Sequence, residues 1–411
     1  MGSFLFTGGR LLDPARDELL DGMHLLVEGG RIREVSDRPI TGVSATAIDL
    51  GGRTIMPGLV DCHVHVNASS VDISQNAALP SSLAALRAAR IMRGMLMRGF
   101  TTVRDVGGAD DGLVRAVEEG LIEGPRLVIC GKALGMTGGH TDFRIRSDDR
   151  LGVFADRVGS MGRLRDGVDE VRRAARQEIK AGARFIKIMA NGGVASPNDP
   201  IHALGFSRSE MEAAVEEAEM AGTYVSAHLY TDKAIRRAVE CGVHSLEHCN
   251  LIQPETASFA AEHGAVAVPT LVTYEGLAKD GAALGLKPES VAKIETVRQS
   301  GMDSLAIIRD AGLPMAFGTD LLGDMHRYQS MEFEIRSRVL KSADILRSAT
   351  TVAAKLCRME DEIGTLAAGA YADLLVVDGD PYRDLGVLQN DGRHLAAIMR
   401  DGVFVKNELS T

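Results

Sequence analysis

Six side chains in this sequence have the chemistry of metal ligands, and each lies within or directly after a short apolar run. His63 and His65 are two residues apart, so a β-strand would point both rings to the same face. Imidazole and carboxylate groups together are ligands for zinc or a similar divalent ion. The candidate ligands are His63, His65, Lys187, His228, His248 and Asp320.

Lys187 is the unusual member because it lies in the apolar sequence Phe-Ile-Lys-Ile-Met at 185–189. Burial there costs the ammonium group its hydration and favours the neutral amine. A neutral amine can react with carbon dioxide to give a carbamate, an anion whose two oxygens can bridge two metal ions. Ions about 3.5–4 Å apart can share a hydroxide and polarise a substrate carbonyl.

Each candidate has an ordinary explanation when it is considered alone. A histidine in a strand is more often a core residue with a satisfied hydrogen bond, and a lysine in an apolar segment usually extends to solvent. Asp320 follows a Gly-Thr pair and could simply cap a turn or a helix. The occurrence of all of them on predicted strands, near the same strand end, favours a metal site.

The elements that must position these residues are eight apolar runs that alternate with helical stretches. Such alternation predicts an α/β fold, specifically a (β/α)8 TIM barrel, whose active site forms at the C-terminal ends of the strands. The expected strands are residues 58–66, 101–106, 126–131, 185–190, 223–228, 245–249, 265–271 and 315–320. The expected helices include residues 81–98, 169–181, 207–221, 232–241 and 288–311.

Both ends of the chain have a different pattern, with short strands bounded by tight turns. These strands are expected at residues 3–6, 23–28, 31–35, 47–50, 372–377, 396–399 and 403–406. The Asp401-Gly402 pair between the last two predicts a hairpin. We therefore expect a small β-sandwich domain made of residues 1–57 plus 360–411, and a barrel made of residues 58–359.

Composition narrows the possible partners and the compartment. The 411-residue chain has a formal net charge of -10, which disfavours nucleic acid and anionic membranes as partners. Its five cysteines are widely spaced and odd in number, which is typical of reduced thiols in the cytoplasm. The N-terminus has no signal-peptide pattern, and no apolar run is long enough to span a bilayer. We expect a cytoplasmic homo-oligomer.

The ligand pattern and its surroundings resemble the amidohydrolase superfamily. The resemblance rests on Met-Pro-Gly-Leu-Val-Asp-Cys-His-Val-His at 56–65, on the four later ligand candidates, and on the segment 363–377. It implies a barrel with two divalent metal ions, for which zinc is the default and manganese or cobalt are alternatives.

The resemblance also implies a role for each ligand candidate. His63, His65 and Asp320 would hold the more buried ion, and His228 and His248 would hold the other. Lys187 would be carbamylated (N6-carboxylysine) and would bridge the two. Asp320 would also take a proton from the bridging hydroxide and pass it to the leaving group, as a general acid–base catalyst.

Three loop segments, at 135–140, 191–197 and 228–232, resemble the prolidase-like or imidazolonepropionase-related branch of this superfamily. That branch includes Xaa-Pro dipeptidase-like carboxypeptidases that act on dipeptides and N-acyl amino acids. His140 and Tyr230 are therefore candidate substrate-binding residues, and His140 a candidate catalytic one, because either could donate a hydrogen bond to a developing oxyanion. Alternatively, His140 only fixes a Gly-Gly turn and Tyr230 only packs under the rim.

The sequence leaves the cleaved bond open. A dipeptide carboxylate needs an arginine fork or a ring of donors, and Arg144, Arg146 and Arg327 are candidates, although solvated arginines are the default. His326 and Asp324 are further loop candidates. We expect cleavage of an amide bond in a dipeptide or N-acyl amino acid. The alternatives are hydrolysis of cyclic amides or of aryl amides, ureas or carbamates, and a catalytically inactive barrel that serves in binding.

Overall fold

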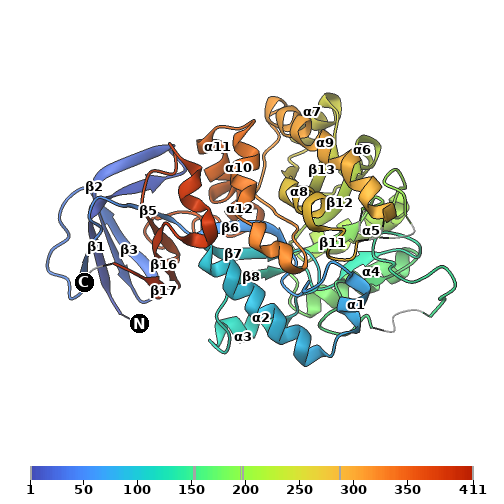
Figure 1. The fold of residues 1–411 in the computed structure, drawn as a ribbon, viewed down its shortest axis with the longest axis horizontal. Coiled ribbons are helices and arrows are strands. Elements are labelled where there is room, and N and C mark those ends of the chain that lie inside the picture. The colour runs from blue at the N-terminus through green and yellow to red at the C-terminus, as the bar shows by residue number, and fades with distance from the viewer. Residues whose placement is uncertain (1, 151–153, 195, 197–198, 287, 410–411) are drawn as a thin grey trace.

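The computed structural model describes residues 2–150, 154–194, 196, 199–286 and 288–409. Figure 1 shows two parts along the long axis, a β-sheet that carries both chain ends and a larger part in which helices surround strands. Within the described residues, no helix combines the length and apolar character needed to cross a membrane.

The terminal strands form one eight-stranded sheet in the order β17-β16-β15-β5-β1-β2-β3, with β4 paired to β1 beside β5. The antiparallel pairing of β5 with β15 joins the two ends of the chain. Alternate side chains such as Leu25, Val27, Leu374 and Val376 share one buried core. The strands are β1 (Phe4–Asp13), β2 (Glu18–Glu28), β3 (Arg31–Ser36), β4 (Thr46–Asp49), β5 (Thr54–Pro57), β15 (Leu374–Val377), β16 (Leu395–Arg400) and β17 (Val403–Asn407).

The hairpin between β16 and β17 is confirmed. Asp401 and Gly402 have φ angles of 51° and 73°, and a two-residue turn of this kind requires positive φ at both positions. Strand β5 was not among the expected strands. It runs directly towards the first strand of the larger part through Gly58, where a Cβ atom would lie 2.1 Å from Thr101 Oγ1.

The larger part contains two parallel sheets. One consists of β6 (Leu59–Val64), β7 (Phe100–Asp105) and β8 (Arg126–Ile129) in that order. The other has the order β10-β9-β11-β12-β13-β14. Its strands are β9 (Ala133–Gly135), β10 (Gly162–Leu164), β11 (Ile186–Met189), β12 (Val225–Thr231), β13 (Ser245–Leu251) and β14 (Val266–Val268).

Two expected strands differ from the prediction. The third, expected at 126–131, ends at Ile129 as β8, which pairs with β7, because Gly131 turns the chain at a φ of 71°. The strand that follows, β9, lies outside the expected range and pairs with β11. The eighth, at 315–320, has only one bridge, from Met315 to Ala267. Its backbone still forms hydrogen bonds with the strands on both sides, β14 and β6. Ala316 N donates to Ala267 O at 2.9 Å, and Cys62 N donates to Phe317 O at 2.7 Å.

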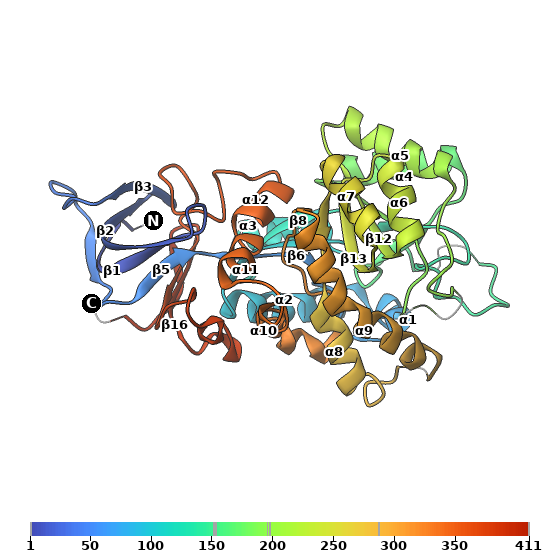
Figure 2. The same cartoon turned by 90° about the horizontal axis from the view of Figure 1, so that it is seen from above.

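The expected helices are confirmed to within two residues at each end. One of them, α5, begins where Ser207 and Glu210 form a capping box. Figure 2 shows α5, α6 and α7 on the outside of β12 and β13. The helices are α1 (Ile73–Ala78), α2 (Ser81–Met97), α3 (Asp111–Glu118), α4 (Val168–Lys180), α5 (Arg208–Met220), α6 (Asp232–Glu240), α7 (Pro254–Glu262), α8 (Leu271–Asp280), α9 (Pro288–Asp310), α10 (Met331–Ser337), α11 (Ser342–Ser348) and α12 (Thr351–Leu356).

Candidate active site

One cavity brings together the six candidate ligands and His140 from elements that are far apart in the sequence. They come from β6 and the residue directly after it, from β11, β12 and β13, from the loop after β9, and from the segment that follows α9. The polar residues that line the cavity are His63, His65, His140, Thr141, Lys187, His228, His248 and Asp320. Its apolar lining consists of Ile73, Phe143, Met161, Met189 and Leu322.

His63, His65 and Asp320 form the tightest group in the cavity. One ligand atom from each lies within 4.8 Å of the others. Asp320 Oδ1 is 3.4 Å from His63 Nε2 and 3.2 Å from His65 Nε2. The Asp320 backbone N donates to His63 O at 2.8 Å and its φ is 52°, a strained conformation that aspartate tolerates better than most residues. This geometry suits a divalent ion bound by two imidazoles and a carboxylate.

The Nδ1 atoms of the His63 and His65 rings are each bonded to a hydrogen-bond acceptor. His63 Nδ1 donates to Glu247 Oε2 at 2.7 Å, and His65 Nδ1 donates to Gly107 O at 2.9 Å. Asp105 holds the Gly107 loop, because its carboxylate accepts the backbone N–H of Gly107 at 3.1 Å. Such partners fix the tautomer and direct the Nε2 atoms of both rings towards Asp320.

His228 and His248 lie next to each other, with ring centroids 4.7 Å apart. His228 Nε2 lies 3.3 Å from Gly192 O, and His248 Nδ1 lies 2.8 Å from Thr270 Oγ1. These bonds leave Nδ1 of His228 and Nε2 of His248 available as ligand atoms. Burial lowers the pKa of both imidazoles well below the usual value, so both are neutral, the form in which histidine binds a metal.

Lys187 is almost completely buried in β11 and its Nζ atom has no hydrogen-bond partner among the described residues. Burial lowers the pKa of Lys187 to about 8. Close to one lysine in ten is therefore neutral at pH 7, which is far more than at an ordinary lysine. An orphaned, reactive amine that lines a cavity of metal ligands fits a carbamate bridge.

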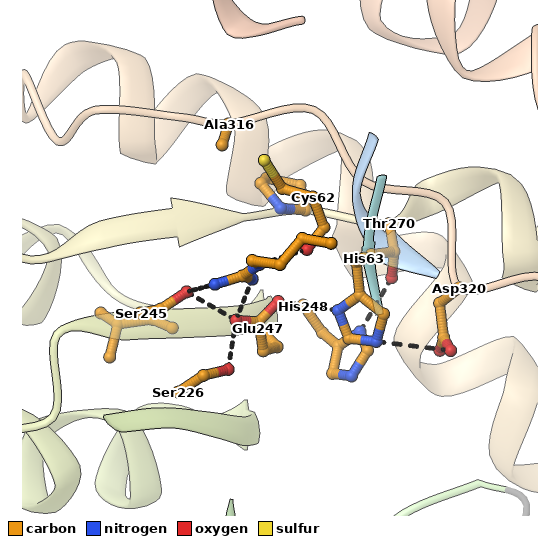
Figure 3. Close-up of polar contacts among 12 residues, drawn as sticks. Cys62, His63, Ser226, Ser245, Glu247, His248, Thr270, Ala316 and Asp320 are labelled. Atoms are coloured by element: carbon orange, nitrogen blue, oxygen red, sulfur yellow. Dashed lines mark hydrogen bonds and ion pairs between the residues drawn. The ribbon is translucent and has the colours of Figure 1, made fainter. Parts of the chain in front are cut away.

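Glu247 is a functional residue that the sequence reasoning missed. Figure 3 shows its carboxylate bonded to Ser226 and Ser245, with His63 pointing towards Asp320. Oε1 of Glu247 also accepts from Arg104 at 2.7 Å, and both side chains are fully buried. Burial raises the pKa of Glu247, but the charge of Arg104 outweighs it and the pKa is well below the usual value.

Strand alternation alone would place Glu247 and His248 on opposite faces of β13. The positive φ of His248, 72°, and of Cys249, 58°, turns the strand end so that both side chains reach the interior. A glutamate within a predicted strand, directly before His248, was the signal in the sequence for a buried, paired carboxylate.

We expect Glu247→Gln to weaken metal binding about 10- to 100-fold, because His63 loses the anionic partner that orients it and raises its basicity. Arg104 would also keep a buried charge with no counter-ion, which costs about 3–5 kcal/mol of unfolding free energy. Metal competition with a chelator and urea unfolding of the metal-free protein measure the two effects. Ser226→Ala is the matched control, since it removes one neutral donor from the same carboxylate. Equal metal affinities for Glu247→Gln and Ser226→Ala would contradict this role.

His140 stacks on His228, with centroids 4.1 Å apart and an angle of 19° between the rings. Its Nδ1 atom is 2.7 Å from Ser196 Oγ and 3.4 Å from Asp199 Oδ2. A Cβ atom on Gly193 would lie 1.7 Å from His140 Cε1, so only glycine permits this position of the ring. Gly193 and Ser196 belong to the second predicted loop, 191–197, of which Ala195 and Pro197 lie outside the described residues, and Asp199 lies two residues beyond it.

Tyr230 lies behind the metal-ligand cavity instead of lining it. Its ring is 4.7 Å from that of His228 and 5.2 Å from that of His248. Tyr274 Oη donates to Tyr230 Oη at 3.1 Å, which leaves the Tyr230 proton for another acceptor. Burial raises the pKa of Tyr230, so the hydroxyl stays protonated.

The arginines suggested for a substrate carboxylate do not line the cavity. Arg144 forms two bonds, of 2.7 and 2.6 Å, with Asp142. Arg327 bonds Asp280 at 2.5 Å and Tyr328 at 3.0 Å. Arg146 and Asp324 are not among the lining residues either, and His326 Nε2 bonds Ala68 O at 3.1 Å. Among the described residues that line the cavity, Lys187 is the only lysine or arginine.

Comparison with known proteins identifies the family of this chain. The model of the family described as "Amidohydrolase family" matches residues 54–405. A crystal structure of an amidohydrolase is 52% identical, with a TM-score of 0.97, and the match covers 99% of this chain and 100% of that one. A prolidase crystallised with N-methylphosphonate-L-proline is 51% identical, with a TM-score of 0.97 and coverage of 98% and 100%. Ochratoxinase of Aspergillus niger is 32% identical over 348 residues, which are 82% of this chain and 72% of that protein. The chain belongs to the amidohydrolase family, as a prolidase-like hydrolase that acts on carbon–nitrogen bonds.

Proposed function

We propose that this protein is a metal-dependent amidohydrolase that cleaves a dipeptide or N-acyl amino acid with two divalent ions, zinc by default. The observation that carries the proposal is the orphaned amine of Lys187 in a cavity otherwise lined by imidazoles and a carboxylate. His63, His65 and Asp320 would hold the more buried ion. His228 and His248 would hold the other, and carbamylated Lys187 would bridge them.

The scaffold for this chemistry is a closed (β/α)8 barrel of residues 58–359, with residues 1–57 and 360–411 as a β-sandwich domain. Closure on one side is supported by the bonds of Ala316 to Ala267 and of Cys62 to Phe317. On the other side it is supported by the pairing of Leu134 with Ile188 and by the bond from Arg184 N to Ile129 O at 2.7 Å. In such a barrel, all ligand-bearing strand ends face one mouth.

Two divalent ions in this site would activate a water molecule and polarise the scissile carbonyl. Asp320 accepts a proton from the attacking water and delivers it to the leaving nitrogen. His140, which is fixed through Nδ1, would present its other edge to the substrate and stabilise the oxyanion as it forms. Tyr230 packs against His228 and His248 behind the cavity and would hold these two rings in place.

The apolar lining indicates which substrates fit. Met161, Met189, Phe143, Ile73 and Leu322 present no charge, and the two methionines adapt to side chains of several shapes. We infer that the acyl side is neutral and apolar. The similarity to a prolidase bound to a proline derivative supports proline as the first leaving group to test.

The direct test is release of free amino acid by zinc-loaded protein from dipeptides X-Pro and from N-acyl prolines, with Met, Leu, Phe, Asp and Arg at X. We expect kcat/KM to be at least about tenfold higher for the apolar members than for Asp or Arg, since a charge in an apolar pocket is costly. Hydrolysis of no dipeptide or N-acyl amino acid would contradict the proposal.

One observation favours a second candidate function. Other than Lys187, no lysine or arginine among the described residues lines the cavity, so a substrate without a free carboxylate would also fit. Such substrates are cyclic amides and aryl amides, ureas or carbamates. Turnover of these compounds, with none of the dipeptides or N-acyl amino acids, would select this second function.

A further inference from the structure

Lys293 of α9 reaches across to the segment that holds His140. Its Nζ atom donates to three backbone carbonyls, Gly193 O at 3.1 Å, Ser196 O at 3.0 Å and Asp199 O at 2.8 Å. An ammonium group has three protons, so these carbonyls use its whole donor capacity. The lysine is nearly a hundred residues away from this segment in the sequence.

The same segment supplies the hydrogen-bond partners of the His140 ring. Asp199 Oδ2 accepts from Gly193 N at 2.8 Å, and Asp199 Oδ1 accepts from Ser196 Oγ. Because the Ser196 hydroxyl proton is used in this way, its oxygen accepts from His140 Nδ1. Ser196 and Asp199 are both buried, so these bonds are shielded from water.

The helix that carries Lys293 is itself fixed against the catalytic strands. Asn250 at the end of β13 donates through Nδ2 to Val297 O at 2.9 Å. Ile294 and Val297 are buried next to Lys293 on the same helix. The lysine therefore ties residues 193, 196 and 199, none of which lies in a helix or strand, to a helix that is packed against the barrel.

We propose that Lys293 is a positioning residue, which sets the place of His140 over His228 by holding residues 193, 196 and 199. The proposal rests on the proposed function, in which His140 contacts the substrate. Gly193, one of the residues that Lys293 holds, lies so close to the ring that a Cβ atom there would overlap it, so a shift of this segment moves the ring. A displacement of about 1 Å at such a group can cost 100-fold in rate.

The test is a double-mutant cycle with Lys293→Met and His140→Ala on the metal-loaded protein. We expect Lys293→Met alone to lower kcat about 10- to 100-fold with a smaller change in KM, and to cost nothing further once His140 is absent. Lys279→Met is the matched control, because Lys279 is an exposed lysine on α8 that contacts the Tyr328 ring. A wild-type kcat for Lys293→Met, or an equal loss in both backgrounds, would overturn the proposal.

A second readout does not depend on the substrate. Hydrogen exchange in residues 191–205 is expected to rise in Lys293→Met and to stay unchanged in Lys279→Met, at equal metal content. If Lys293→Met does not fold, Lys293→Gln, which keeps two donors, takes its place. Unchanged exchange overturns the positioning role. If exchange increases in Lys293→Met but the wild-type protein hydrolyses no amide, the proposed function is refuted, while the role of Lys293 in holding residues 193, 196 and 199 stands.

Discussion

Asp320→Asn is expected to lower kcat by about 10³- to 10⁴-fold, because a carboxamide can neither accept the proton of the attacking water nor pass it on. Asparagine is the right replacement because it tolerates the positive φ of 52° at this position, so the fold should be unchanged. Kinetics on the best substrate, with metal analysis of the same sample, measure the effect.

The matched control is Asp303→Asn, which makes the same chemical change on an exposed residue of α9. Its kcat should equal that of the wild-type protein. If Asp320→Asn kept both a full complement of metal and a kcat within tenfold of the wild type, proton transfer would have to be assigned to another residue.

Lys187→Met is expected to abolish activity and to reduce metal content, while the metal-free protein becomes more stable. The side chain stays unbranched and of similar size, but the bridging oxygens are lost. The pKa of Lys187 is lowered from 10.5 to about 8, so folding at pH 7 has to bury a charged amine. Removing that cost raises the unfolding free energy of the metal-free protein by up to roughly 3 kcal/mol.

The stability that metal-free Lys187→Met gains over the metal-free wild-type protein falls as the pH rises. The penalty for the buried ammonium is fully present below pH 8 and disappears as the pH rises towards 10.5, where the unfolded chain also loses the proton. Urea unfolding of both metal-free proteins at pH 7 and 10 measures the difference. Lys180→Met, on the exposed face of α4, controls for loss of a lysine. Full metal content and activity in Lys187→Met would exclude a carbamate bridge.

The metal-ligand candidates could be identified from the sequence because the signals were local. Polar residues at the ends of apolar runs stand out, and two histidines two residues apart share a face of any strand. The terminal sheet was also predictable, since its turns carry Gly and Asp pairs such as Asp401-Gly402, whose backbone conformation few other residues adopt.

The remaining features depend on long-range contacts. Glu247 and His248 both reach the interior because the backbone turns at His248 and breaks strand alternation. No residue type in the sequence predicts such a turn. Lys293 has the sequence character of an ordinary helix-surface lysine, and its role depends on carbonyls from another segment. Arg144 and Arg327 have the side-chain chemistry to bind a substrate carboxylate, but Asp142 and Asp280 already bind them.

The proposed two-metal site is tested most directly by a titration of metal-free protein with zinc in bicarbonate buffer. Release of proline from methionyl-proline is the readout. We predict no activity without metal and a rate that rises until two ions are bound per chain. A rate that is unchanged by zinc, or that reaches its plateau at one ion per chain, would contradict it.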